Sequence, residues 1–417
     1  MEKYIIRGGR KLNGSVKVHA SKNAVLPILA ASILTEEKVR IRNCPGISDV
    51  VNMLEILRIL GCRIDWEGSD VVIDSSQADK HKIPVSLAKK LRSSIFMLGS
   101  IIGRFGSARI SYPGGCDIGL RPIDLHIKGL KSLNVDIVEH FGMIDCNGKG
   151  LCGGVINLDF PSVGATENIM MAATLAKGKT VILNAAKEPE IEDLQNFINA
   201  MGGKVSGAGS STVEIEGVSE LHGAEYSPMP DRIVAGTYLI AGAMCGGEIE
   251  VQNVNAEHIQ SVLFKLRESA CKIECNRDKI VLTAPERLQA CHLIETNPYP
   301  GFATDLQAQM LAALSIAEGT SVIVENIFET RFKHAGELVK MGANITIRDR
   351  MAVVRGVPQL SGAEVFAFDL RGGAALVLAG LAAAETTIVN DIYHIERGYF
   401  EFEKNLSALG ADICKAD

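Results

Sequence analysis

The chain has 417 residues, which is enough for two to three domains with sizeable cores. Apolar residues make up 47% and charged residues 22%, proportions typical of a soluble globular enzyme. The formal net charge of -6 excludes a general nucleic-acid or membrane-surface binder, although a local basic pocket is compatible with it.

The sequence contains no clear signal for secretion, for a membrane span or for a disulfide framework. Residues 1–14 contain no long apolar core after their charges, so we expect no signal peptide. The most apolar stretch, residues 374–384, is too short to span a bilayer. Ten cysteines in a long chain without a leader are typical of reduced thiols rather than of a disulfide framework. We therefore expect a cytoplasmic protein without membrane or nucleic-acid partners.

The first predicted element is a β-strand at residues 2–8, and a sixfold pattern follows it. Each copy has an apolar helix, a turn and a strand rich in Val and Ile. Helices that are apolar on all sides are buried rather than amphipathic. The copies occupy residues 26–43, 95–112, 169–185, 239–253, 310–326 and 376–391.

A second signature follows each of these copies. It is a helix that ends in small residues and leads into a short strand. The matching positions are Gly61, Asn134, Gly202, Ala270, Gly342 and Gly410, at steps of 73, 68, 68, 72 and 68 residues.

Six α/β units of this size are too many for one small core, so the sequence predicts two domains of three units each. We place one domain at residues 21–229 and the other at residues 1–20 plus 230–417, with a proline-containing linker at 227–232. If the N-terminal strand pairs with the last repeat, the chain crosses between domains twice. A solenoid is the structural alternative, but its repeats are usually shorter.

Polar residues recur where the six buried helices begin. The equivalent positions are Lys22, Arg92, Ser162, Asp231, Asp305 and Asp369, at steps of 70, 70, 69, 74 and 64 residues. Helix capping is the simpler explanation for the serine and the three aspartates. Capping does not explain the cations at the same places, because a cation opposes the helix dipole. These cations are Lys22, Arg92, Arg232 and Arg371.

The cations therefore predict a compensating anion, and free N–H groups at helix starts already favour one. We expect the helix starts of the two domains to face a cleft for a phosphate- or carboxylate-bearing ligand. Solvated surface charges are the alternative.

The connection before each second helix is also polar. Its residues are Asp49, Cys116 with Arg121, Glu188 with Glu190, His258, Arg331 and Arg397. The second copy, residues 111–126, is longer and rich in glycine, which is typical of a lid. A thiol near Arg121 gains thiolate character, so Cys116 is a candidate nucleophile or acid rather than an inert packing cysteine. No paired C-x-x-C spacing suggests a metal.

Eight segments carry a family resemblance. They are SKNAVLPILAA, PGGCDIGLRPIDLH, FPSVGAT, AAKEPEIEDL, PGFATDLQAQ, FETRFKH, FDLRGGAALVLAG and YHIERGY. Together they resemble the UDP-N-acetylglucosamine enolpyruvyl transferase family, from residue 3 to about residue 414. The sister family, the 5-enolpyruvylshikimate-3-phosphate synthases, shares the six-repeat fold but lacks the cysteine loop.

The resemblance implies a two-domain inside-out α/β barrel like that of EPSP synthase. It also implies transfer of the enolpyruvyl group of phosphoenolpyruvate to the 3'-hydroxyl of UDP-N-acetylglucosamine, with release of phosphate. This reaction is the first committed step of peptidoglycan synthesis, and it proceeds by addition and elimination. The resemblance implies no cofactor and no metal, and we expect a monomer.

Residue roles carry over position by position. The resemblance implies that Lys22, Arg121 and Arg397 bind phosphoenolpyruvate, that Asp305 is the base, and that Cys116 protonates the methylene carbon. It implies contacts to the nucleotide sugar from Asn23, Arg92, Arg121, Pro122, Ile123, Asp124, Leu125, Ser162, Val163 and Ile327. Asp369 and Arg371 match further site residues, and Asp49 and Arg331 match positions that couple the site to domain closure. We add Gly164 and Glu188 as substrate-binding candidates, because they lie in the repeated polar slots.

Some positions depart from the family pattern. Phe160 stands where some relatives have lysine, and two glycines follow Arg371 where alanines are common. Three alternatives stay open: a shikimate-phosphate enolpyruvyl transferase, a non-catalytic paralogue that binds the nucleotide sugar and regulates wall synthesis, and a redox-sensing thiol protein. The presence of Cys116, Lys22, Asp305 and Arg397 favours the enzyme.

Overall fold

The computed structural model describes residues 2–114, 118–119 and 122–417, so the predicted roles of Cys116 and Arg121 lie outside the described residues. The chain divides into two compact units. Unit 1 comprises residues 1–19, 116–120 and 230–417, and unit 2 comprises residues 20–115 and 121–229. Each unit has its own hydrophobic core. Within the described residues, no helix is long and apolar enough to cross a membrane.

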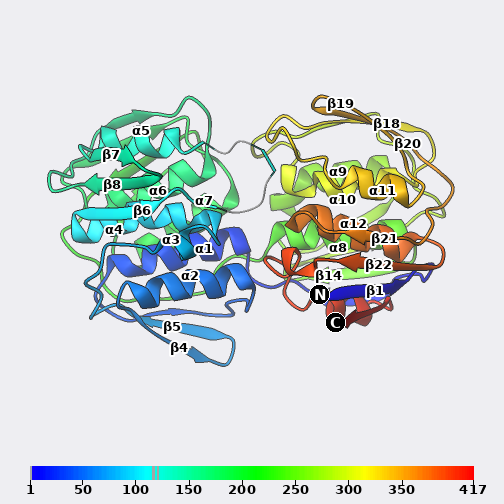
Figure 1. Ribbon diagram of the computed structural model, residues 1–417, viewed down its shortest axis with the longest axis horizontal. Helices are drawn as coiled ribbons and strands as arrows, with labels where there is room; N and C mark the ends of the chain where they lie inside the picture. Colours follow the sequence, from blue (N-terminus) through cyan, green and yellow to red (C-terminus); the bar gives the residue numbers. More distant parts are fainter. Residues whose placement is uncertain (1, 115–117, 120–121) are drawn as a thin grey trace. The chain divides into compact units, whose positions relative to one another are not determined.

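Unit 2 contains three repeats, each with its own sheet (Figure 1). Its strands are β3 (Val39–Ile41), β4 (Arg63–Glu67), β5 (Asp70–Asp74), β6 (Ser107–Ser111), β7 (Asp136–His140), β8 (Met143–Asn147), β9 (Val155–Asn157), β10 (Lys179–Leu183), β11 (Lys204–Ser206), β12 (Thr212–Glu216) and β13 (Glu225–Tyr226). The strand orders are β13-β3-β5-β4, β6-β8-β7 and β11-β12-β10-β9. Its helices are α1 (Lys22–Ala31), α2 (Ser48–Ile59), α3 (Val85–Ala88), α4 (Met97–Phe105), α5 (Asp124–Ser132), α6 (Val163–Thr174), α7 (Pro189–Ala200) and the 3-10 helices η1 (Ser32–Leu34) and η2 (Arg92–Phe96).

Unit 1 repeats this plan with three four-stranded sheets. Its strands are β1 (Lys3–Arg7), β2 (Gly14–Lys17), β14 (Glu248–Gln252), β15 (Lys272–Cys275), β16 (Lys279–Thr283), β17 (Leu293–Glu295), β18 (Thr320–Val324), β19 (Asn344–Arg348), β20 (Met351–Arg355), β21 (Glu364–Phe366), β22 (Thr386–Asn390) and β23 (Asp412–Ala416). The orders are β15-β16-β14-β2, β17-β18-β20-β19 and β21-β22-β1-β23. Its helices are α8 (Arg232–Cys245), α9 (Gln260–Glu268), α10 (Gln307–Leu314), α11 (Ala335–Lys340), α12 (Leu370–Ala382), α13 (Phe402–Ala408), η3 (Ala256–Ile259), η4 (Thr304–Leu306) and η5 (Ile392–His394).

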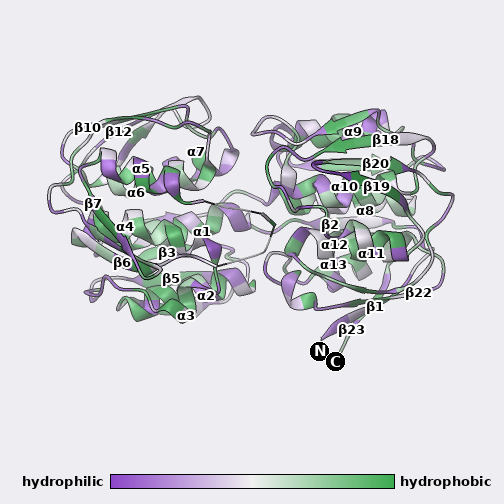
Figure 2. Ribbon diagram, turned by 45° about the horizontal axis from the view of Figure 1, so that its top comes forward, coloured by the Kyte–Doolittle hydropathy of each residue, from purple (hydrophilic) through white to green (hydrophobic). Residues whose placement is uncertain are grey.

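The first helix of each repeat lies in the core, as its apolar composition predicts. Every residue of α10 and α8 except Cys245 is buried, and α8, α10 and α12 contact one another. In unit 2, α4 contacts both α1 and α6. The sheets lie around these helices, and hydrophobic residues cover much of the length of α1, α4 and α12 in Figure 2. Alternating burial along the strands shows that each sheet has one face on the core and one outside.

The N-terminal strand β1 completes the last repeat. It pairs antiparallel with both β22 and β23, with Ile5 opposite Ile388 and Cys414. In the other four-stranded sheets, the strand in this position comes from the same repeat as its neighbours. The chain therefore starts in unit 1, enters unit 2 after β2, and returns to unit 1 before α8.

Candidate active site

In unit 2, the predicted phosphate-binding cation is held by a buried carboxylate. Lys22 is the first residue of α1, and its Nζ lies 2.9 Å from Oδ2 of Asp49 in the first turn of α2. The Asp49 side chain is 2% exposed, whereas that of Lys22 is 13% exposed. The pair fixes the start of α1 against α2, and Lys22 is the less buried partner.

The start of α6 combines a cap with a close approach. Ser162 Oγ accepts a hydrogen bond from the backbone N–H of Ala165 at 3.3 Å, so the predicted cap is present. A Cβ at Gly164 would lie 3.1 Å from the Phe96 ring and 3.2 Å from the His126 ring. Val163 is half-buried beside it. The glycine thus lets the helix start pack close to two rings.

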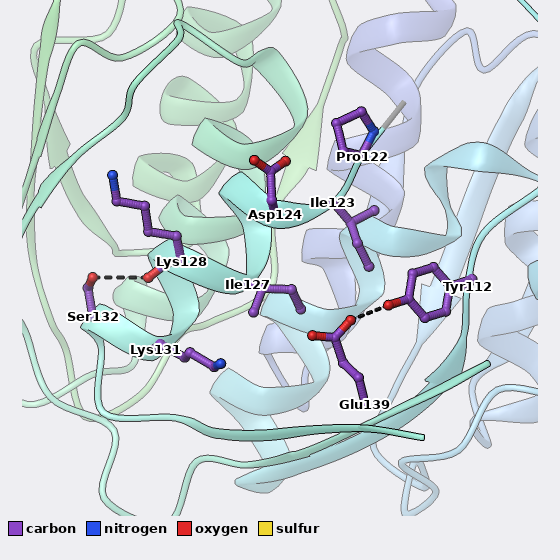
Figure 3. A pocket seen from close by; sticks show the side chains of 9 residues that line it. All are labelled: Tyr112, Pro122, Ile123, Asp124, Ile127, Lys128, Lys131, Ser132 and Glu139. Atoms are coloured by element: carbon purple, nitrogen blue, oxygen red, sulfur yellow. Dashed lines mark hydrogen bonds between the residues drawn. The ribbon is translucent and has the colours of Figure 1, made fainter. Parts of the chain in front are cut away.

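Pro122 and Ile123 lead into α5 at the edge of a pocket of about 740 Å³. Pro122 and Asp124 are exposed there, Ile123 is buried, and Leu125 is half-buried just outside the lining. Figure 3 shows Lys128 and Lys131 on the same helix, and a Tyr112–Glu139 hydrogen bond at the other side. The lining combines Lys128 and Lys131 with Asp124 and Glu139, and Lys128 is paired with Asp159 at 2.7 Å, so the pocket has mixed charge.

Other predicted residues of unit 2 also start helices. Asn23 is half-buried in the first turn of α1, Arg92 is half-buried at the start of η2, and Glu188 is the N-cap residue of α7. Phe160 is 46% exposed, which leaves its ring accessible to a ligand.

In unit 1, the predicted base Asp305 is held by two buried arginines. Its Oδ1 accepts from Arg331 Nη2 at 2.7 Å, and its Oδ2 accepts from Arg371 Nη2 at 3.1 Å. The Asp305 side chain is 26% exposed, but the arginine side chains are 4% and 2% exposed. The two arginines therefore hold the carboxylate in one orientation, and it is the least buried member of the cluster.

Asp369 organises the same region from the start of α12. Its Oδ1 accepts from the N–H groups of Arg371 and Gly372, each at 3.0 Å, which is an N-cap. His334 is buried nearby, and burial lowers its pKa to about 4. The positive charge of Arg331 lowers this pKa further, while Asp369 opposes the shift. His334 is thus a neutral imidazole near pH 7.

The remaining predicted residues of unit 1 lie on connections. Arg397 is half-buried after η5, and Ile327 is half-buried after β18. Burial and the positive charge of Arg397 lower the pKa of the neighbouring His394.

Two expectations about the helix starts need correction. Capping accounts for Ser162, Asp231 and Asp369, but Asp305 lies inside η4 and makes no side-chain cap there. The need for an external anion is also smaller than the sequence suggests. Lys22 has a carboxylate partner in Asp49 at the start of a second helix, and Arg371 has one in Asp305 at another buried-helix start.

The chain has the following relatives. The family described as EPSP synthase (3-phosphoshikimate 1-carboxyvinyltransferase) matches residues 6–406. A protein from Caldanaerobacter subterraneus named UDP-N-acetylglucosamine 1-carboxyvinyltransferase 2 is 54% identical over 415 residues, which is 100% of both chains. The UDP-N-acetylglucosamine 1-carboxyvinyltransferase of Geobacter metallireducens is 48% identical over 99% of both. The chain belongs to this carboxyvinyltransferase family. The predicted resemblance is confirmed.

Two solved structures share the fold. The enolpyruvyl transferase NikO from Streptomyces tendae has a TM-score of 0.89 at 24% identity, covering 100% of this chain and 99% of that one. EPSP synthase from Acinetobacter baumannii has a TM-score of 0.77 at 17% identity, covering 100% of both. At these identities the likeness is one of fold, and it confirms the predicted EPSP synthase-like two-domain α/β class.

Proposed function

We propose that this carboxyvinyltransferase family member transfers the enolpyruvyl group of phosphoenolpyruvate to the 3'-hydroxyl of UDP-N-acetylglucosamine and releases phosphate. This is the first committed step of peptidoglycan synthesis. The observation that carries the proposal is the 54% identity over the whole chain to a relative named for this reaction. The same identity argues against a shikimate-phosphate acceptor, because the EPSP synthase structure is only 17% identical.

The proposed chemistry needs a base at oxygen and an acid at carbon. In the addition step, the 3'-oxygen forms a bond to C2 of phosphoenolpyruvate, its proton passes to Asp305, and C3 receives a proton from Cys116. In the elimination step, C3 returns a proton to the Cys116 thiolate, the C2–C3 double bond forms again, and the C2–O bond to phosphate breaks as phosphate takes the proton held by Asp305. The orientation of Asp305 by Arg331 and Arg371 supports its assignment as the base.

The substrates carry phosphate and carboxylate groups, which require fixed cations. The proposal assigns Lys22, Arg121 and Arg397 to phosphoenolpyruvate. It assigns the nucleotide sugar to residues at the helix starts and connections, with Asp49 and Arg331 linking these contacts to domain closure. These residues are Asn23, Arg92, Pro122, Ile123, Asp124, Leu125, Ser162, Val163, Gly164, Glu188, Ile327, Asp369 and Arg371. We also propose that the enzyme is a cytoplasmic monomer.

The test is to mix the protein with phosphoenolpyruvate and UDP-N-acetylglucosamine, measure phosphate release, and identify the enolpyruvyl product by mass. Shikimate 3-phosphate in place of the nucleotide sugar is the control acceptor. We expect release only with the nucleotide sugar. Binding of the nucleotide sugar without release would instead support a regulatory paralogue.

A further inference from the structure

Two parallel strands of the fifth repeat end next to each other, close to Asp305. β17 and β18 pair in parallel, and the N–H of Thr296 donates to the carbonyl of Val324 at 3.0 Å. The next residue after β18 is Glu325, whose side chain is fully buried. A buried carboxylate is costly unless it is fully hydrogen-bonded, so its partners define its role.

Glu325 accepts hydrogen bonds from three separate segments. Its Oε1 accepts from Thr296 Oγ1 at 2.8 Å, from Ile327 N at 2.8 Å and from Phe328 N at 3.0 Å. Its Oε2 accepts from Thr304 Oγ1 at 2.9 Å. One side chain therefore ties the end of β17, the turn before α10 and the loop after β18.

The other repeats build this turn differently. In four repeats the residue at or just after the end of the matching strand is Asn or Asp, and in the second repeat it is Tyr112. The four are Asn43, Asn184, Asn253 and Asp391. Among the described residues, these four have positive φ values of 49°, 54°, 56° and 58°, and Glu325 does not. Asn and Asp tolerate the left-handed region better than a longer side chain does.

The amide side chains of two of these asparagines also make a simpler contact. Asn184 donates to the carbonyl of Leu158 at 2.8 Å, and Asn253 donates to the carbonyl of Val18 at 2.7 Å. Each contact joins only two strand ends. In the fifth repeat, which carries Asp305, the Glu325 carboxylate makes four hydrogen bonds at this place.

The second carboxylate oxygen of Glu325 is linked to Asp305 by hydrogen bonds through Thr304 and Arg331. The Thr304 hydroxyl donates to Glu325 and accepts from Arg331 Nη1 at 3.2 Å, while Arg331 Nη2 donates to Asp305 at 2.7 Å. The backbone carbonyl of Asp305 is held separately by Gln309 Nε2 at 3.0 Å. Glu325 thus fixes the Thr304 hydroxyl that orients the guanidinium pairing with Asp305.

We propose that Glu325 is a positioning residue that holds the Ile327–Phe328 loop and the Thr304–Asp305 turn in one fixed arrangement. This inference rests on the proposed function, in which Ile327 contacts the nucleotide sugar and Asp305 takes the 3'-hydroxyl proton. Glu325 touches neither substrate. It holds Ile327 and Asp305 in fixed positions relative to each other. A misplacement of about 1 Å at such a site costs roughly 100-fold in rate.

The chemistry of the side chain suggests a graded set of variants. Glu325→Ala removes all four acceptor contacts. Glu325→Gln keeps one oxygen that can accept from the N–H groups of Ile327 and Phe328 and from the Thr296 hydroxyl. Its NH2 group can donate to the lone pairs of the Thr304 hydroxyl. Thr304→Val removes only the branch toward Asp305. Glu337→Ala is the matched control, because Glu337 is also buried in unit 1 and accepts from the Phe366 N–H at 3.0 Å.

The experiment measures kcat and KM for the nucleotide sugar by phosphate release, together with the melting temperature. We expect Glu325→Ala to lose about 100-fold in kcat and to raise KM, and Glu325→Gln to recover most of both. Thr304→Val should lower kcat and leave KM near its original value, and Glu337→Ala should lower only the melting temperature.

Wild-type kcat and KM in folded Glu325→Ala would overturn the inference, as would an equal kcat loss in Glu337→Ala. If Glu325→Ala does not fold, Thr304→Val decides, and unchanged kcat there overturns the inference. A wild-type protein that releases no phosphate overturns the proposed function itself, and the positioning role with it.

Discussion

The two units use the same kind of ion pair with opposite polarity. In unit 2 the anion is buried and the cation is accessible, since Asp49 is 2% exposed and Lys22 is 13% exposed. In unit 1 the cations are buried and the anion is accessible, since Arg331 and Arg371 are 4% and 2% exposed and Asp305 is 26% exposed. In each unit the more buried side chains of the ion pairs hold the less buried side chain in position.

We propose that this difference reflects a division of chemical work, in which Lys22 binds the phosphate of one substrate and Asp305 removes a proton from the other. A buried counterion orients the working group and reduces its freedom, which lowers the reorganisation needed during reaction. Substitutions at each ion pair distinguish whether a unit needs its more buried partner, its less buried partner or both.

The largest expected effect comes from neutralising the exposed anion of unit 1. Asp305→Asn keeps one oxygen that can accept from an arginine, replaces the other with an NH2 donor, and cannot take up the 3'-hydroxyl proton. We expect kcat to fall by about 100- to 10,000-fold, with little change in nucleotide-sugar affinity measured by calorimetry. Turnover near the wild-type rate would contradict the base assignment and leave Asp305 as a structural counterion.

A second large effect should come from the thiol of Cys116. Cys116→Ser replaces the acid with a group that is much harder to ionise, so we expect kcat to fall by about 100-fold or more. The variant should also resist alkylation by fosfomycin-type epoxides, measured by intact-protein mass. Full activity would remove the proton-donor role. A loss of alkylation without loss of turnover would show that the thiol is reactive but dispensable.

Removing the buried anion of unit 2 should have a moderate effect. Asp49→Ala takes away the carboxylate that orients Lys22, and breaking a buried pair costs about 3–5 kcal/mol of unfolding free energy. We expect a lower melting temperature and a higher KM for phosphoenolpyruvate. The matched control is Asp65→Ala, whose partner Arg63 lies 3.1 Å away with both side chains more than half exposed, so its effect should be below about 1 kcal/mol. Equal losses in the two variants would contradict the orienting role of Asp49.

Sequence alone predicts the repeats, the buried helices and the polar residues at helix starts, because each depends on local periodicity. It does not predict which polar residues pair. Asp305 and Arg371 are 66 positions apart and meet only when α10 and α12 pack together. His334 is missed because charged neighbours suggest an exposed segment. Glu325 is also missed, although the repeats contain the signal: four copies have Asn or Asp where the fifth has Glu.

The smallest predicted effect concerns pH, and it has opposite signs in the two units. Burial lowers the pKa of His334 in unit 1 to about 4, so between pH 6.5 and 4 the unfolded chain binds a proton that the folded chain does not. Stability from this site falls as pH falls. Burial raises the pKa of Asp193 in unit 2 from 3.8 to about 6. Between pH 6 and 3.8 the folded chain therefore binds a proton that the unfolded chain does not. Stability from Asp193 rises as pH falls toward 3.8.

Each site contributes at most about 1.4 kcal/mol per pH unit, which is small beside acid effects elsewhere in the chain, so the test compares variants with the wild type. Calorimetric melting at pH 7, 6 and 5 should show His334→Gln gaining stability relative to the wild type as pH falls. Asp193→Asn should lose relative stability, because its amide cannot take up the proton. Parallel curves for either variant would show that burial does not shift that group, and the contrast between the units would then be confined to their ion pairs.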